Sequence, residues 1–178
     1  REVCDLANIT FIRQKETRGL GHAVSRARSF VGDDPFVVLY GDDVILGDVP
    51  VTKQLIDAYE KYGKMCCGIK EVAPEFVMKY SSLKVDKIED RIYNVTDMIE
   101  KPKTIEEAYS RFSILGRVLL TPEIFDILDK TPPGAGNEIQ LTDAMATVAR
   151  TKGMTGVDFI GKRYDMGNKL EILKANIE

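Results

Sequence analysis

The sequence predicts an α/β fold in which a mostly parallel central sheet is flanked by helices and carries a small antiparallel insertion. Apolar runs that end at glycine or acidic residues alternate with amphipathic helical segments, which is typical of strands covered on both faces. Two short strand-like segments near the middle of the chain interrupt this alternation. With 178 residues the chain can bury one full core, so we expect a single domain over residues 1–178.

The first half of the chain alternates between strand-like and helical segments. Residues 9–13 predict a short strand, and a glycine-containing turn separates them from a helix over 22–30. A continuous apolar run at 36–40 predicts a buried strand, which stops at a glycine and two aspartates. A helix over 52–62 and a strand over 65–72 follow.

The second half begins with the insertion and then returns to the alternating pattern. Segments 83–85 and 91–99 predict two short antiparallel strands joined by a polar connection. The remaining expected elements are a strand at 113–120, a helix at 122–128, a Pro- and Gly-rich loop at 131–136, a helix at 139–150, strand material at 157–164 and a closing helix at 169–177.

Composition excludes several classes of function. The 25 basic and 28 acidic residues nearly balance, so there is no basic footprint for nucleic acid and we expect no nucleic-acid partner. No apolar run approaches the length of a membrane-spanning helix, and we expect no membrane association. The chain starts at Arg1 rather than at a methionine, from which we expect a fragment of a longer protein.

The three cysteines predict a reducing environment. Cys66 and Cys67 are adjacent and Cys4 is distant, which fits neither a disulfide framework nor the spacing of paired metal ligands. We therefore expect reduced, mostly buried thiols in a cytoplasmic protein.

The first of three polar clusters surrounds the glycine-containing turn. In open α/β sheets ligands bind beyond the carboxyl ends of strands, so polar residues and glycines at those ends are candidates. The Gln14 amide offers a donor and an acceptor to a base edge, and Gly19 lacks the Cβ that would keep a flat ligand off the backbone. The alternative is an ordinary turn before a helix.

The second cluster is acidic. Asp42 and Asp43 follow the strand at 36–40, and Asp165 follows the last strand. Mg²⁺ commonly takes one or two protein carboxylates and completes its shell with water and phosphate, so Asp42 and Asp165 are candidate magnesium ligands. The alternative is that these acids cap helices.

The third cluster is Glu100-Lys101-Pro102, where proline must end the strand. A carboxylate accepts hydrogen bonds from sugar hydroxyls, and an ammonium binds phosphate as a point charge, which together suit a sugar phosphate. The alternative is a surface ion pair with little energetic effect.

With these clusters in this order, the chain resembles the bacterial UTP–glucose-1-phosphate uridylyltransferases, a branch of the sugar nucleotidyltransferases. The resemblance covers essentially the whole chain, and five strings carry it: RQKETRGLGHAV from Arg13, PFVVLYGDDVI from Pro35, EKP from Glu100, TPPGAGNEIQLTDAM from Thr131 and GKRYDMGNK from Gly161. It implies a Rossmann-like nucleotidyltransferase fold, with UTP and glucose 1-phosphate as substrates, UDP-glucose as product, Mg²⁺ as cofactor and a homo-oligomer.

The resemblance also implies roles for the candidate residues. Gln14 and Gly19 are implied at the uracil, and Asp42 and Asp165 at the magnesium ion. Glu100 is implied at the glucose hydroxyls and Lys101 at the sugar phosphate. The implied catalytic residues are therefore Asp42, Lys101 and Asp165. The reaction implied is in-line attack of a glucose 1-phosphate oxygen on the α-phosphorus of UTP, which needs charge neutralisation more than proton transfer.

Other family positions have less defined roles. Tyr80 and Ser81 are implied at the substrate, although the family usually has tyrosine followed by glycine, and a Cβ at 81 could clash or change the backbone angle. Similarly, Gly116-Arg117-Val118 stands where the family has glycine-arginine-tyrosine. For His22 we expect a structural role. For Glu138, Gln140 and Asp143 we expect an architectural role or a subunit contact.

The family's first strand and its glycine-rich, basic loop, which grips the triphosphate, have no counterpart before Ile9. We therefore expect that N-terminal strands are missing and that this chain alone is inactive. Three alternatives remain: a related sugar nucleotidyltransferase such as a thymidylyltransferase, a metal-dependent glycosyltransferase, and an inactive module that binds nucleotide sugars.

Overall fold

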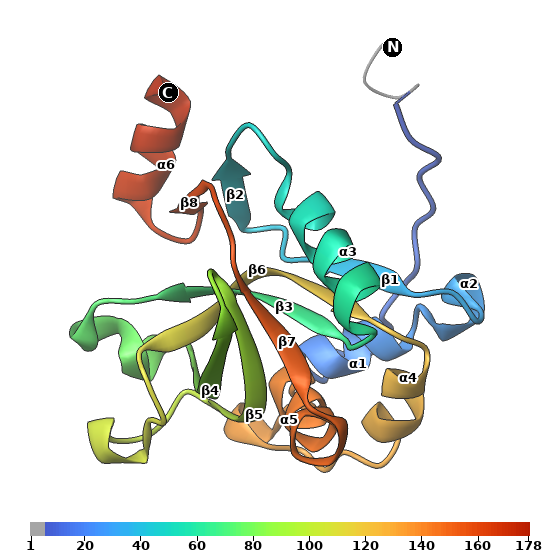
Figure 1. The fold of residues 1–178 in the computed structure, drawn as a ribbon. Coiled ribbons are helices and arrows are strands. Elements are labelled where there is room, and N and C mark those ends of the chain that lie inside the picture. Colours follow the sequence, from blue (N-terminus) through green and yellow to red (C-terminus); the bar gives the residue numbers. More distant parts are fainter. Residues whose placement is uncertain (1–5) are drawn as a thin grey trace.

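The central element is a six-stranded sheet (Figure 1). The computed structural model describes residues 6–178, so Cys4 lies outside the described residues. In spatial order the strands are β1 (Phe36–Leu39), β6 (Phe112–Leu120), β3 (Cys66–Glu71), β7 (Met154–Asp158), β5 (Ile92–Glu100) and β4 (Ser81–Glu89).

Helices cover both faces of this sheet. On one face, α3 (Val51–Tyr62) buries Leu55 against a cluster that includes Cys66. On the other, a larger cluster contains Cys67 and residues of α1, α4 and α5. Adjacent strand residues point to opposite faces, so the two neighbouring thiols belong to different cores, and both are buried as expected. The remaining helices are α1 (Leu20–Ser25), α2 (Arg28–Val31), α4 (Glu123–Leu128), α5 (Leu141–Lys152) and α6 (Lys169–Ile177), with short 3₁₀ turns at Pro74–Lys79, Ile105–Glu107 and Ala135–Asn137.

The α/β class is confirmed, but the expectation of a mostly parallel sheet was wrong. Of the pairings in the six-stranded sheet as described, β3 with β7 is parallel and the other four are antiparallel. The cause is that a strand buried on both faces has the same apolar pattern in either direction. In particular, β6 lies antiparallel between β1 and β3, which the composition of its residues does not reveal.

Two expectations near the N-terminus were also wrong. Residues 9–13 form no strand, and Phe11 is 93% exposed. An apolar pattern becomes a strand only where a neighbouring strand accepts its hydrogen bonds, and in the described chain these residues lie outside both sheets. The helix expected over 22–30 is two short helices, because the chain leaves α1 at Arg26 and enters α2 after Ala27.

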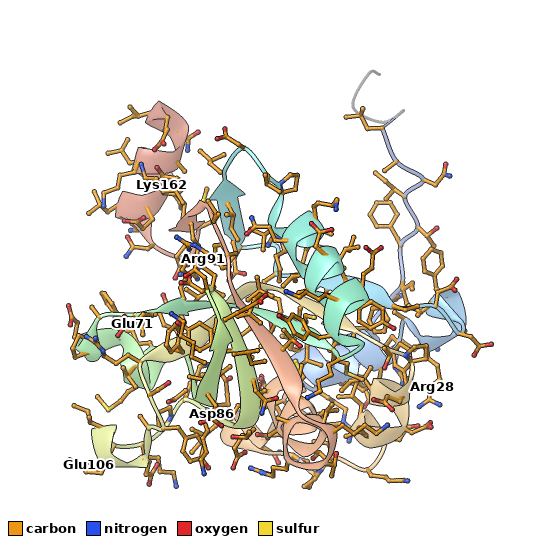
Figure 2. The ribbon with its side chains drawn as sticks, viewed as in Figure 1. Arg28, Glu71, Asp86, Arg91, Glu106 and Lys162 are labelled. Atoms are coloured by element: carbon orange, nitrogen blue, oxygen red, sulfur yellow. The ribbon has the colours of Figure 1, made fainter. Side chains whose placement is uncertain are left out.

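The antiparallel pair β4–β5 was predicted, although β4 is longer than the expected segment 83–85. Arg91, at the hairpin tip labelled in Figure 2, has a positive φ of 58°. The hairpin is no separate insertion, because β5 also pairs with β7 in the central sheet. None of the described helices has the length and apolar character needed to cross a bilayer.

A second, two-stranded sheet positions the candidate site. The strand material expected at 157–164 divides into β7 and β8 (Lys162–Asp165), with Gly161 at φ 151° between them. Strand β8 pairs antiparallel with β2 (Asp43–Leu46), which sequence reasoning missed. This pairing places Asp43 directly opposite Asp165.

Candidate functional site

A cavity of about 470 Å³ lies where the two sheets and the start of α5 meet. It brings together six of the eight predicted site residues: Asp42, Tyr80, Ser81, Glu100, Lys101 and Asp165. These residues come from the end of β1, the start of β4, the end of β5 and the end of β8. The remaining lining residues are Leu20, Leu39, Tyr40, Gly41, Asp43, Lys79, Ile114, Leu115, Gln140, Leu141, Thr142 and Arg163.

The backbone holds Asp42 and Asp165 at one edge of the cavity. The Met166 amide donates to the Asp42 carbonyl at 2.8 Å, next to the pairing of Asp43 with Asp165. Asp165 also accepts from the Gly167 amide at 2.9 Å, whereas the Asp42 residue is exposed. The β2–β8 pairing thus brings Asp42 and Asp165, which are 123 residues apart in sequence, onto neighbouring stretches of backbone.

Asp43 has a different partner and a different role. Its side chain is 4% exposed, and its Oδ1 accepts from Arg163 Nε at 2.5 Å. Burial raises the pKa of the Asp43 carboxyl, and the Arg163 guanidinium opposes that shift. Asp43 is therefore a buried anchor for an arginine, while Asp42 is left to face the cavity.

Arg163 and Tyr80 support Asp165. The Tyr80 hydroxyl donates to Asp165 Oδ2 at 2.9 Å, and the Arg163 guanidinium lies 3.7 Å from the same oxygen. The guanidinium also lies over the Tyr80 ring, 5.2 Å from its centroid. Desolvation raises the pKa of the Tyr80 phenol, so the hydroxyl remains a donor at neutral pH. Sequence reasoning missed Arg163, although it lies in the GKRYDMGNK string two residues before Asp165.

Glu100 and Lys101 end β5 at the opposite side of the cavity. Glu100 Oε2 accepts from the Thr142 hydroxyl at 2.7 Å, and its Oε1 lies 3.9 Å from Lys101 Nζ. The Glu100 side chain is 17% exposed and that of Lys101 is 60% exposed. Lys101 has a positive φ of 47°, and its amide donates to the Tyr80 carbonyl at 3.1 Å. The strand thus ends with a held carboxylate beside an ammonium that reaches solvent.

Ser81, at a position where the family usually has glycine, lines the cavity. Its hydroxyl accepts from the Ile114 amide at 3.0 Å, and its carbonyl accepts from the Ser113 hydroxyl at 2.5 Å. The residue is buried at the junction of β4 with β6. The serine side chain is therefore part of the sheet contact.

Gln14 and Gly19 do not line the cavity, which contacts their turn only at Leu20. The Gln14 amide nitrogen donates to the Gly19 carbonyl at 3.2 Å and lies 2.8 Å from His22 Nδ1. Gly19 has φ 96°, and a Cβ there would come within 2.7 Å of the Glu138 Cβ. Gln14 and Gly19 thus stabilise the turn itself, and His22 contacts the Gln14 amide within that turn.

Within the described residues, no group of three or more His, Cys, Asp or Glu side chains is placed to hold a metal ion. The cavity lining has four carboxylates and three cationic side chains, namely Lys79, Lys101 and Arg163, which gives it a net charge of −1. A ligand with phosphate groups would need additional positive charge in such a site.

Comparison with known proteins gives consistent results. Residues 3–178 match the family model described as nucleotidyl transferase. The chain is 45% identical over 178 residues to a UTP–glucose-1-phosphate uridylyltransferase of Bacillus subtilis and 46% identical over 174 residues to one of Staphylococcus epidermidis. The two alignments include 100% and 98% of this chain, respectively, and each covers 60% of the relative's length.

Two solved structures share its fold. A UDP-glucose pyrophosphorylase complexed with UDP-glucose superimposes with a TM-score of 0.90 at 41% identity, over 94% of this chain and 64% of that one. A UTP-bound enzyme of the same name from Acinetobacter baumannii gives a TM-score of 0.81 at 32% identity, over 93% and 57%. The chain thus spans about three fifths of the proteins that it matches.

Proposed function

Since the chain belongs to the nucleotidyl transferase family, we propose that it serves the formation of UDP-glucose and pyrophosphate from UTP and glucose 1-phosphate. The observation that carries this proposal is the meeting of Asp42, Asp165, Glu100 and Lys101 in one cavity. The names of its relatives at 45% and 46% identity support the same reaction, as does its similarity to a structure complexed with UDP-glucose.

Charge and donor chemistry support a magnesium ion at Asp42 and Asp165. Asp43 is already engaged by Arg163, which leaves two carboxylates at this edge for a cation that completes its shell with water and phosphate oxygens. When bound, the ion would neutralise phosphate charge and orient the reacting groups. Tyr80 and Arg163 would keep the Asp165 carboxylate aimed at the ion.

The opposite side of the cavity would bind glucose 1-phosphate. Glu100 would accept hydrogen bonds from glucose hydroxyls, and the exposed Lys101 ammonium would meet the sugar phosphate. An oxygen of that phosphate then attacks the α-phosphorus of UTP in line, and the bond from this phosphorus to the pyrophosphate oxygen breaks. No proton transfer is required, so the residues act by orientation and charge. Gln14 and the backbone near Gly19 would read the base.

Isothermal titration calorimetry with three nucleotide sugars tests the proposal. We expect UDP-glucose to bind at least about tenfold more tightly than ADP-glucose, because a site that pairs with one base edge leaves polar groups unpaired against another. Equal affinities would contradict the proposed uracil site. Tighter binding of dTDP-glucose than of UDP-glucose would favour a thymidylyltransferase.

A further inference from the structure

We propose that Thr142 is a positioning residue that holds Glu100 away from Lys101, so that both charges stay available to the sugar phosphate. The inference rests on the proposed function, because it assigns the sugar side of the cavity to Glu100 and Lys101. Thr142 belongs to the string EIQLTDA, to which the sequence assigns no chemistry.

The contact between Thr142 and Glu100 is short and protected from solvent. The Thr142 hydroxyl donates to Glu100 Oε2 at 2.7 Å, and the Thr142 residue is 8% exposed. Thr142 is the second residue of α5, so the carboxylate also lies at the positive end of a twelve-residue helix. Both effects hold one carboxylate oxygen at the helix and leave Oε1 as the oxygen nearer to Lys101.

Lys101 would compete for that carboxylate. Its ammonium is 3.9 Å from Glu100 Oε1, which is the outer limit of an ion pair. Without the Thr142 hydroxyl, rotation of the Glu100 side chain would bring the two charges into direct contact. A closed ion pair would remove an acceptor from the sugar hydroxyls and a cation from the phosphate at the same time.

The other end of the same segment is fixed to the turn on the base side. The Ile139 amide donates to the Arg18 carbonyl at 2.8 Å, and the Ile139 carbonyl accepts from the Gly21 amide at 2.8 Å. A Cβ on Gly21 would come within 2.8 Å of that carbonyl oxygen, so the two backbones are in close contact. Residues 139–142 therefore connect the turn that carries Gln14 and Gly19 with the carboxylate of Glu100.

The test compares UDP-glucose with UDP, since UDP lacks the sugar. Calorimetry is run on the protein with Thr142→Val, which keeps the shape but lacks the hydroxyl, and with Thr142→Ser, which keeps the hydroxyl. Thr147→Val is the matched control, because it makes the same substitution at an exposed position of α5. Glu100→Gln, alone and combined with Thr142→Val, completes a double-mutant cycle.

We expect Thr142→Val to weaken UDP-glucose binding about tenfold or more relative to UDP, which is the effect of losing a hydrogen bond to a charged group. Thr142→Ser should retain the wild-type ratio of the two affinities, and so should Thr147→Val. In the Glu100→Gln background, Thr142→Val should have little further effect on that ratio. If the wild type binds both ligands and Thr142→Val leaves the ratio of the UDP-glucose and UDP affinities unchanged, the role of Thr142 is refuted while the proposed function stands. If the wild type binds neither ligand, the proposed function fails and this inference fails with it.

Discussion

Arg163 should contribute more to stability than any exposed ion pair of the same strand. Arg163→Met removes the partner of Asp43, whose side chain is 4% exposed, while the Arg163 side chain is 16% exposed. Loss of one member of a buried pair leaves an uncompensated charge and costs about 3–5 kcal/mol. Since both groups are largely buried, we expect Arg163→Met to lower the free energy of unfolding by about 3 kcal/mol, a large part of the roughly 5–15 kcal/mol of a typical domain.

Urea unfolding at pH 7 followed by circular dichroism measures this loss, because the chain has no tryptophan for fluorescence. The matched control is Lys162→Met, in which the neighbouring side chain, labelled in Figure 2 and 61% exposed, loses its surface pair with Glu178. That variant should leave the free energy of unfolding almost unchanged, because ion pairs between exposed side chains contribute little to stability. A loss below about 1 kcal/mol in Arg163→Met would refute the reasoning.

The double variant Asp43→Asn/Arg163→Met tests the cause of the loss. It removes the stranded carboxylate, so it should be more stable than Arg163→Met alone. The single variant Asp43→Asn is measured as well. If the loss of unfolding free energy in the double variant equalled the sum of the losses in Asp43→Asn and Arg163→Met, the two residues would act independently. The buried ion pair would then be the wrong explanation.

Two further predictions concern the proposed magnesium site and the thiols. Asp42→Asn and Asp165→Asn should each remove most of the pyrophosphate release by the full-length protein. The double variant should be little less active than either single variant, because the two carboxylates act as one unit. If the two fold-losses in activity multiplied in the double variant, a shared ion would be excluded. In a Cys4→Ser background at pH 8, Cys66 and Cys67 should not react with a thiol reagent until denaturant is added. Burial raises the pKa of Cys66 to about 12, which leaves about one thiolate in ten thousand at pH 8, and burial raises the pKa of Cys67 as well. Rapid reaction of the native protein would contradict the burial of these two thiols.

The strand ends were the most predictable part of the site. An apolar run that stops at acids or at proline marks the point where a strand leaves the core, and this rule located Asp42, Glu100 and Asp165. All three line one cavity. The rule works because it depends on local composition, which the sequence records directly.

Strand direction and strand partners were less predictable, because they depend on residues far away in the sequence. The segment at 9–13 has an apolar pattern but no neighbouring strand among the described residues. Thr142 lies 42 residues after Glu100, and only the folded chain brings its hydroxyl to that carboxylate. No local pattern distinguishes such a threonine from one that faces solvent.

Arg163 differs from Thr142 because its position beside Asp43 and Asp165 follows from strand geometry once the strand pairing is known. Residues two apart in a strand face the same side, so Arg163 and Asp165 share one face of β8. With Asp43 opposite Asp165, Arg163 is the diagonal neighbour of Asp43, close enough for a long side chain to reach it. Two acids that meet across paired strands repel each other, and a cation on the same face relieves that repulsion. In this chain an arginine two residues before the strand-end acid Asp165 thus accompanies an acidic neighbour across the strands, and it identifies Asp43 as the acid that the arginine holds.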